Sequence, residues 1–161
     1  EHLVRAEAQE RLVRAHVLMR IEPGEAARLM AEEGYVYLDV RTIGEWATGH
    51  PPGSRNVPYS LAEAGGLQPN PLFLPLVRAL FGPSQGLVVA CAAGRRSQGA
   101  LRDLRQAGYE RAVELGSGFS GVKDPFGRLL TPGWRDLGLP VAHDLEAGSY
   151  QALLEAAGLT A

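Results

Sequence analysis

Cysteine and lysine are nearly absent from this chain of 161 residues, which holds one of each, Cys91 and Lys123. A single cysteine cannot form an internal disulfide, so cysteine use does not decide between a reducing and an oxidising compartment. A cytoplasmic location is slightly favoured, and a periplasmic one after removal of a signal peptide stays open. The single lysine leads to no functional conclusion.

Long apolar runs, basic runs and metal-ligand spacings are also missing. No apolar stretch reaches the roughly 18 residues of a membrane span, so no membrane span is expected. With no basic run and a formal charge of −2, the chain gives no reason to expect a nucleic-acid partner. His2, His16, His50 and His143 have no ligand spacing with one another or with Cys91, so no metal site is expected.

The composition is that of one globular domain, with 45% apolar and 21% charged residues. No internal repeat indicates a second copy of the domain. Apolar periodicity predicts helices that alternate with strands, hence an α/β fold with a central parallel sheet and helices on both faces. Helices are expected at residues 2–15, 24–33, 43–49 (one short turn), 74–81, 97–107 and 149–157, strands at 36–40, 87–90 and 112–115, and a proline-rich loop at 67–74.

Cys91 directly follows the apolar run Leu87–Ala90, and a helical pattern begins at Ser97. A thiol in this position would lie over the positive end of the helix, with turn amides pointing at the sulfur and with Arg95 and Arg96 adding charge. Such surroundings favour the thiolate, which is the nucleophilic form of cysteine. A cysteine that only fills the core is the alternative. The two arginines argue against it, because charged residues are seldom fully buried unless they are paired.

Asp39 and Arg41 also fall where a predicted strand ends, and ligands of parallel sheets bind at the carboxyl ends of strands. Asp39 is expected to accept hydrogen bonds that order the neighbouring loops, with a role as general base as the alternative. Arg41 either binds an anion or pairs with a carboxylate such as Glu45. His50 is expected to be structural and bonded to the backbone.

Gly116–Gly121 has the spacing G-x-G-x-x-G after a predicted strand, as in a dinucleotide-binding site. That site also requires a helix to receive the pyrophosphate, and Pro125 and Gly127 interrupt any helix here. We therefore interpret the segment as a turn.

A cysteine phosphatase or arsenate reductase is a second competing interpretation of the cysteine loop. Those enzymes carry an arginine six positions after the cysteine, where this chain has Ser97. A turn that is one residue shorter closes on a smaller radius, which fits a tetrahedral phosphate poorly.

Two ordered motifs and a matching end are similar to one known family. The residues that carry the likeness are Cys91, Gly94, Arg96 and Ser97 of the loop, then Tyr37–Arg41, Glu45-Trp46, Gly49-His50, Pro52-Gly53-Ser54, Asn56 and Pro58, and finally Trp134 with Gly138-Leu139-Pro140. Over residues 21–141 the chain resembles the rhodanese (thiosulfate:cyanide sulfurtransferase) superfamily, whose loop often reads Cys-x-x-Gly-x-Arg-Ser. It departs from the family at Pro51, at Ala92 and in the longer segment 119–133.

The resemblance implies a rhodanese-like three-layer fold at residues 21–141, preceded by a helical extension at 1–20 and followed by a helical tail at 142–161. It implies a sulfurtransferase that moves a sulfane sulfur from thiosulfate or a persulfide to cyanide, a thiol or a protein acceptor, with no cofactor or metal. A non-catalytic module that carries a persulfide or docks on a partner is the alternative. The catalytic residue would be Cys91, on which the persulfide forms. The anion would be bound by the loop Ala92, Ala93, Gly94, Arg95, Arg96 and Ser97, and Asp39 and Arg41 would support the site.

Overall fold

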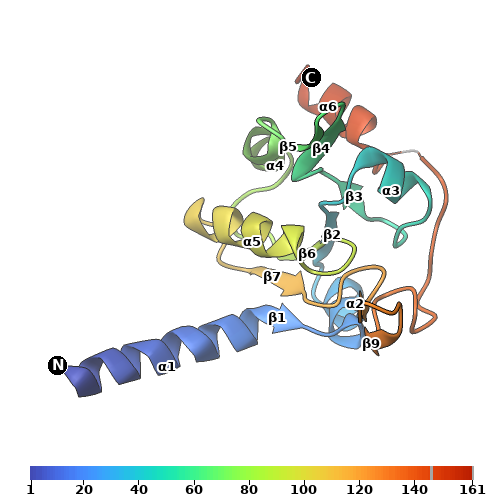
Figure 1. Ribbon diagram of the computed structural model, residues 1–161. Coiled ribbons are helices and arrows are strands. Elements are labelled where there is room, and N and C mark those ends of the chain that lie inside the picture. Colours follow the sequence, from blue (N-terminus) through green and yellow to red (C-terminus); the bar gives the residue numbers. More distant parts are fainter. Residues whose placement is uncertain (146, 161) are drawn as a thin grey trace.

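A computed structural model describes residues 1–145 and 147–160, without the side chains of residues 11–18. Its centre is a five-stranded parallel sheet (Figure 1). Runs of valine and leucine form the inner strands, since such side chains suit a sheet that is buried on both faces. The strands lie in the order β1 (Arg20–Ile21), β7 (Ala112–Leu115), β6 (Leu87–Ala90), β2 (Val36–Asp39) and β3 (Arg55–Asn56).

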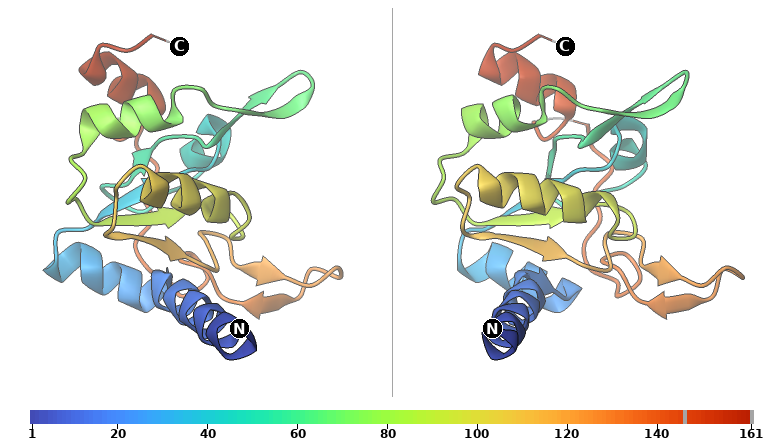
Figure 2. Two further views of the ribbon diagram at one scale, coloured as in Figure 1. Left: turned by 90° about the vertical axis from the view of Figure 1, so that its left-hand side faces the viewer. Right: turned by 60° about the vertical axis from the view of Figure 1, so that its left-hand side comes forward.

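Helices cover both faces of this sheet (Figure 2), which confirms the predicted α/β architecture. Side chains alternate along β6, so that Leu87 and Val89 face one layer while Val88 and Ala90 face the other. Cys91 continues this alternation and faces the same layer as Val89. The layers are formed by α4 (Phe73–Leu80), α5 (Arg96–Gln106) and α6 (Tyr150–Ala157) on that face, and by α2 (Pro23–Glu32) on the other.

The two ends of the chain differ in how they join the domain. The first helix, α1 (His2–Met19), continues beyond the predicted end at residue 15 and projects from the body (Figure 1), with Leu3 and Val4 exposed. The last helix, α6, lies against α4 and buries Leu153 and Leu154 in the core. None of the helices in the described ranges combines the length and the apolar character needed to cross a membrane.

Two hairpins depart from the sequence prediction. The loop expected at 67–74 is wrong for its first part, where β5 (Gly66–Pro69) pairs antiparallel with β4 (Ser60–Glu63). Within the longer segment 119–133, β8 (Val122–Lys123) pairs antiparallel with β9 (Leu129–Thr131). Both hairpins are largely exposed, so their backbone pairing does not require the apolar alternation by which strands are recognised in a sequence.

Candidate active site

Cys91 directly follows β6, and its side chain is only 1% exposed. The chain then bends through four residues before α5 begins at Arg96. This bend aims backbone amides at the sulfur: the N–H of Gly94 lies with its nitrogen 3.1 Å from Cys91 Sγ, and that of Ser97 at 3.4 Å. The structure thus places the thiol in a cradle of donors at the start of a helix, an arrangement that stabilises negative charge on sulfur.

The predicted turn Gly116–Gly121 lies directly behind this cradle and is not followed by a helix. The N–H of Phe119 donates to the carbonyl oxygen of Cys91 at 2.8 Å. Gly94 has φ +93°, and a Cβ atom built there would lie 2.2 Å from the carbonyl oxygen of Gly116. Only glycine fits this contact, so the two backbone segments hold the cradle in shape.

Asp39 and Arg41 form a buried ion pair at the end of β2, with exposures of 0% and 3%. Arg41 Nη2 lies 2.8 Å from Asp39 Oδ2 and also donates to the carbonyl oxygen of Gly49 at 2.7 Å. Its guanidinium lies over the Phe119 ring, 4.2 Å from the centroid. Burial raises the pKa of Asp39, and the hydrogen bonds from Arg41 oppose that rise. Arg41 is therefore paired, but its partner is Asp39 and not Glu45.

His50 is buried, and its ring stacks on Trp46 with 3.6 Å between the centroids. Its Nδ1 donates to the carbonyl oxygen of Trp46 at 2.8 Å, which confirms the predicted bond to the backbone. Across the described part of the chain, no group of three or more His, Cys, Asp or Glu side chains is arranged to hold a metal ion.

Glu45 and Arg96 form a contact that the sequence did not predict. Arg96 binds both carboxylate oxygens of Glu45, at 2.6 and 3.0 Å, and so joins α5 to the short helix α3 (Ile43–Ala47). Thr42 caps α3 and also donates to Glu45. Of the two loop arginines expected to add charge near the sulfur, Arg96 is also paired with Glu45, whereas Arg95 is exposed.

The contacts with Arg96 and Thr42 lower the pKa of Glu45. Burial acts to raise the pKa of Glu45, but the hydrogen bonds from Arg96 and Thr42 and the charge of Arg96 together lower it to about 2, from the ordinary 4.5. A carboxyl group whose pKa is depressed in the folded protein contributes stability above its unfolded pKa. That contribution is lost as the pH falls from 4.5 towards 2.

We expect Glu45→Gln to destabilise the protein by about 1–2 kcal/mol at neutral pH, allowing for solvent screening of this half-buried pair. The difference between parent and variant should shrink as the pH falls below 4.5. Urea unfolding at pH 7 and pH 3 measures both values. Glu25→Gln is the matched control, since Glu25 pairs with Arg28 at 2.7 Å on the open surface and should give a smaller effect. A difference that is the same at both pH values would contradict the assignment.

Glu114 is a further buried group that sequence reasoning missed. It lies in β7 with no exposed surface, and its Oε2 accepts a hydrogen bond from Ser97 Oγ at 3.0 Å. Arg20 Nη1 lies 4.0 Å from its other oxygen. The signal in the sequence was an acidic residue inside the apolar run Ala112–Leu115. Burial of a carboxylate in such a strand is costly unless the group is paired or hydrogen-bonded.

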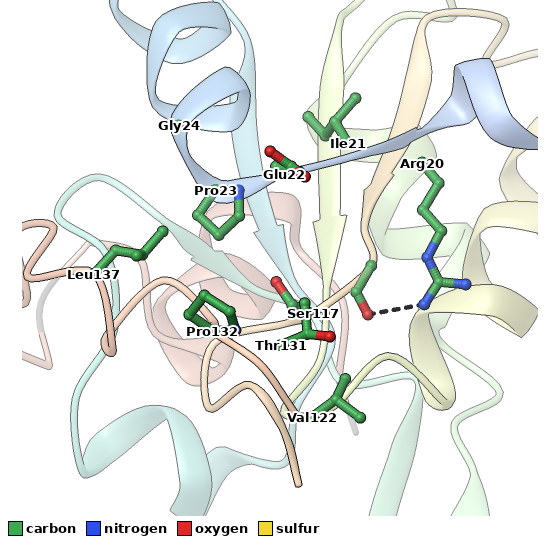
Figure 3. Close-up of a pocket in the computed structure, with 11 residues that line it drawn as sticks. Arg20, Ile21, Glu22, Pro23, Gly24, Ser117, Val122, Thr131, Pro132 and Leu137 are labelled. Carbon is green, nitrogen blue, oxygen red and sulfur yellow. Dashed lines mark hydrogen bonds between the residues drawn. The ribbon is translucent and has the colours of Figure 1, made fainter. Parts of the chain in front are cut away.

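A cavity of about 700 Å³ opens at the carboxyl ends of β1 and β7 (Figure 3). Gly116, which backs the Cys91 cradle, forms part of its wall, but Cys91 itself is not in the lining. The hydroxyl of Ser117 is buried in this lining without a hydrogen-bond partner among the described residues. The cavity is thus separate from the sulfur. Its walls include Arg20, Ile21, Pro23, Val122, Pro132 and Leu137.

A buried cysteine, held by loop amides at the carboxyl edge of a parallel sheet, defines an α/β protein with a thiol-centred site. Residues 22–125 match the protein family described as the Rhodanese-like domain. The chain belongs to this family, which confirms the expectation drawn from its motifs.

Relatives and a solved structure agree with this membership. The chain is 42% identical over 107 residues to thiosulfate sulfurtransferase 16, chloroplastic, of Arabidopsis thaliana, a match that covers 66% of this chain and 79% of that protein. It is 37% identical over 97 residues to rhodanese-like domain-containing protein 15, chloroplastic, of the same plant, covering 60% of this chain and 53% of that protein. The chain therefore spans about half the length of the second relative. The crystal structure of Rv0390 from M. tuberculosis matches with a TM-score of 0.64 and 29% identity, over 78% of this chain and 97% of that chain.

Proposed function

We propose that this protein is a sulfurtransferase that forms a persulfide on Cys91. In the first half-reaction the Cys91 thiolate attacks the outer sulfur of thiosulfate or a similar donor. A new S–S bond forms, and the old one breaks with its electron pair on the departing sulfite. In the second half-reaction cyanide or a thiolate attacks the outer sulfur, and Cys91 leaves as a thiolate. Two half-reactions through a covalent intermediate give ping-pong kinetics.

The single observation that carries this proposal is the pair of amides on the sulfur, with the nitrogens of Gly94 and Ser97 at 3.1 and 3.4 Å from Sγ. Donors that are fixed in place before the reaction stabilise a negatively charged sulfur without reorganisation. The name of the relative from Arabidopsis, a thiosulfate sulfurtransferase, supports the same chemistry. The position six residues after the cysteine is Ser97, so the loop lacks the arginine of a cysteine phosphatase.

The second candidate is a non-catalytic module that carries a persulfide or docks on a partner. Its support is the enclosure of Cys91, which is 1% exposed, and a relative that is named only for its domain. The two candidates differ in one measurable property, because only a sulfurtransferase passes sulfur from a donor to an acceptor in repeated cycles.

We expect brief incubation with thiosulfate to add one sulfur atom to the protein, seen by intact mass spectrometry. Cyanide should remove it and release thiocyanate. Since Cys91 is the only cysteine, the site of the adduct is unambiguous. An aryl phosphate is the negative control. An unchanged mass together with hydrolysis of the aryl phosphate would favour a phosphatase, and an unchanged mass with no hydrolysis would favour the docking module.

A further inference from the structure

Glu114 is a carboxyl group in the middle of the sheet, and the sulfur chemistry above does not use it. It lies on β7 between β1 and β6, where Arg20 and Val89 are its register partners. Its side chain is completely buried, and its Oε1 has no hydrogen-bond partner in the described part of the chain. Burial of a carboxylate with one oxygen that makes no hydrogen bond costs stability, so the presence of Glu114 here calls for an explanation.

The other oxygen of Glu114 is connected to the sulfur by a single hydroxyl group. Ser97 Oγ lies 3.0 Å from Glu114 Oε2 and 3.5 Å from Cys91 Sγ. Ser97 is itself fully buried, so its hydroxyl has no bulk water to exchange with. A serine hydroxyl can donate one proton and accept another. While it donates to Glu114, it can therefore accept the S–H of Cys91.

Two arginines, Arg20 and Arg96, lie near Glu114 or Cys91, and each of them also has another partner. Arg20 faces it from β1 at 4.0 Å, beyond hydrogen-bond distance, and instead donates to the carbonyl oxygen of Gly116 at 3.2 Å (Figure 3). Arg96 acts on Cys91 through its charge but is clamped to Glu45.

Tyr37 and Arg41 lie on the opposite face of the sheet from Glu114. Tyr37, on β2, is fully buried there, and burial, with the charges of Asp39 and Cys91, raises its pKa well above the ordinary value. Tyr37 is therefore neutral at physiological pH, and Arg41, which lies over the Phe119 ring on that side, is paired with Asp39.

We propose that Glu114 is the proton acceptor and donor of Cys91, acting through Ser97. The Cys91 S–H proton passes to Ser97 Oγ, the Ser97 O–H proton passes to Glu114 Oε2, and the products are a thiolate, a hydroxyl that now donates to it, and a neutral carboxylic acid. When Cys91 leaves as a thiolate in the second half-reaction, the same two protons move back. The use in sulfur transfer rests on the proposed function, whereas the proton shift itself requires only the three side chains.

This transfer of protons between Cys91, Ser97 and Glu114, the proton relay, explains why a carboxyl group is tolerated at position 114. A dry site holds two negative charges only at a high free-energy cost, and transfer of the proton keeps the total charge of the pair constant. One negative charge moves from Glu114 to the sulfur, where the amides of the cradle receive it. The rate of Cys91 alkylation should then depend on Glu114 as well as on the thiol itself.

The test is the rate of Cys91 alkylation by iodoacetamide as a function of pH, in the parent and in Glu114→Gln. Glutamine keeps the size and a hydrogen bond to Ser97 but cannot accept the proton. We expect the midpoint of the rate profile to move to higher pH in the variant, with a loss of at least about tenfold at pH 6, as for removal of a general base. If Glu114 were only a buried negative charge, its removal would ease ionisation and the midpoint would move to lower pH, which would overturn the relay. An unchanged midpoint would overturn it as well.

Ser97 provides a second test that holds even if Glu114→Gln does not fold. Ser97→Thr keeps the hydroxyl and should retain the parent profile, whereas Ser97→Ala should move the midpoint to higher pH. Equal profiles for the two variants would refute the path through the hydroxyl. Thermal unfolding monitors the fold of each variant. Alkylation does not depend on any sulfur donor, so the two proposals can fail separately. If the parent protein is alkylated with the expected pH dependence but takes no sulfur from thiosulfate, the proton relay is supported and the proposed function is rejected.

Discussion

Replacement of Cys91 by serine is expected to abolish sulfur transfer and leave the fold intact. The hydroxyl is close in size to the thiol, and the amides of Gly94 and Ser97 can donate to oxygen as they do to sulfur. It is far less ionised at neutral pH, and it cannot form a persulfide. The loss should exceed about 10³-fold in kcat/KM, as for removal of other covalent nucleophiles.

The measurement is a thiosulfate:cyanide assay beside a second assay with a thiol acceptor. Circular dichroism and the urea midpoint serve as the control for folding, since the cysteine belongs to the core. The mass adduct from thiosulfate should be absent in the variant. Residual activity within about tenfold of the parent would show that Cys91 is not the nucleophile.

Gly94→Ala should have the second largest effect, on both stability and turnover. The backbone there has φ +93°, and the new Cβ would meet the carbonyl oxygen of Gly116 at 2.2 Å. Relief of that contact requires movement of the segment that places the Gly94 amide on the sulfur. A displacement of this kind at a reacting centre typically costs about 100-fold in rate. We expect a loss of that order in kcat, with a lower midpoint of unfolding.

Gly108→Ala separates the backbone strain of an alanine with positive φ from the contact between the new Cβ and Gly116. Gly108 follows α5 with φ +100°, and nothing lies within 4 Å of its virtual Cβ, so the variant carries only the backbone strain of about 1–2 kcal/mol. The excess destabilisation of Gly94→Ala over Gly108→Ala, measured by urea unfolding, belongs to the contact with Gly116. If the two variants are equally stable and Gly94→Ala turns over normally, the contact does not hold the cradle.

The strand, turn and helix around Cys91 could be predicted because their signals are local. The apolar run Leu87–Ala90 and the periodicity after Ser97 need no knowledge of the rest of the chain. The positions of Asp39 and Arg41 at the same edge of the sheet followed from parallel pairing alone.

The contacts between distant segments could not be predicted in the same way. Glu45 and Arg96 are 51 positions apart, and only the packing of α3 against the loop brings them within 2.6 Å. Glu114 meets Ser97 because β7 pairs with β6 in one particular register, and a shift by one residue would turn its side chain to the other face. The hairpin at residues 60–69 escaped prediction because most of its residues are exposed and do not show the apolar alternation of a half-buried strand.

The burial of Cys91 bears on the lifetime of a loaded protein between donor and acceptor. If the proposed persulfide forms on Cys91, which is 1% exposed, it would be shielded from water and from oxidants in solution. We expect a small anion such as cyanide to need less opening of residues 92–95 to reach that sulfur than a thiol carried on another protein. Turnover with cyanide would then report the chemical step, whereas turnover with a protein acceptor would report the opening of the loop. Comparison of the two rates would separate storage of the sulfur from its delivery.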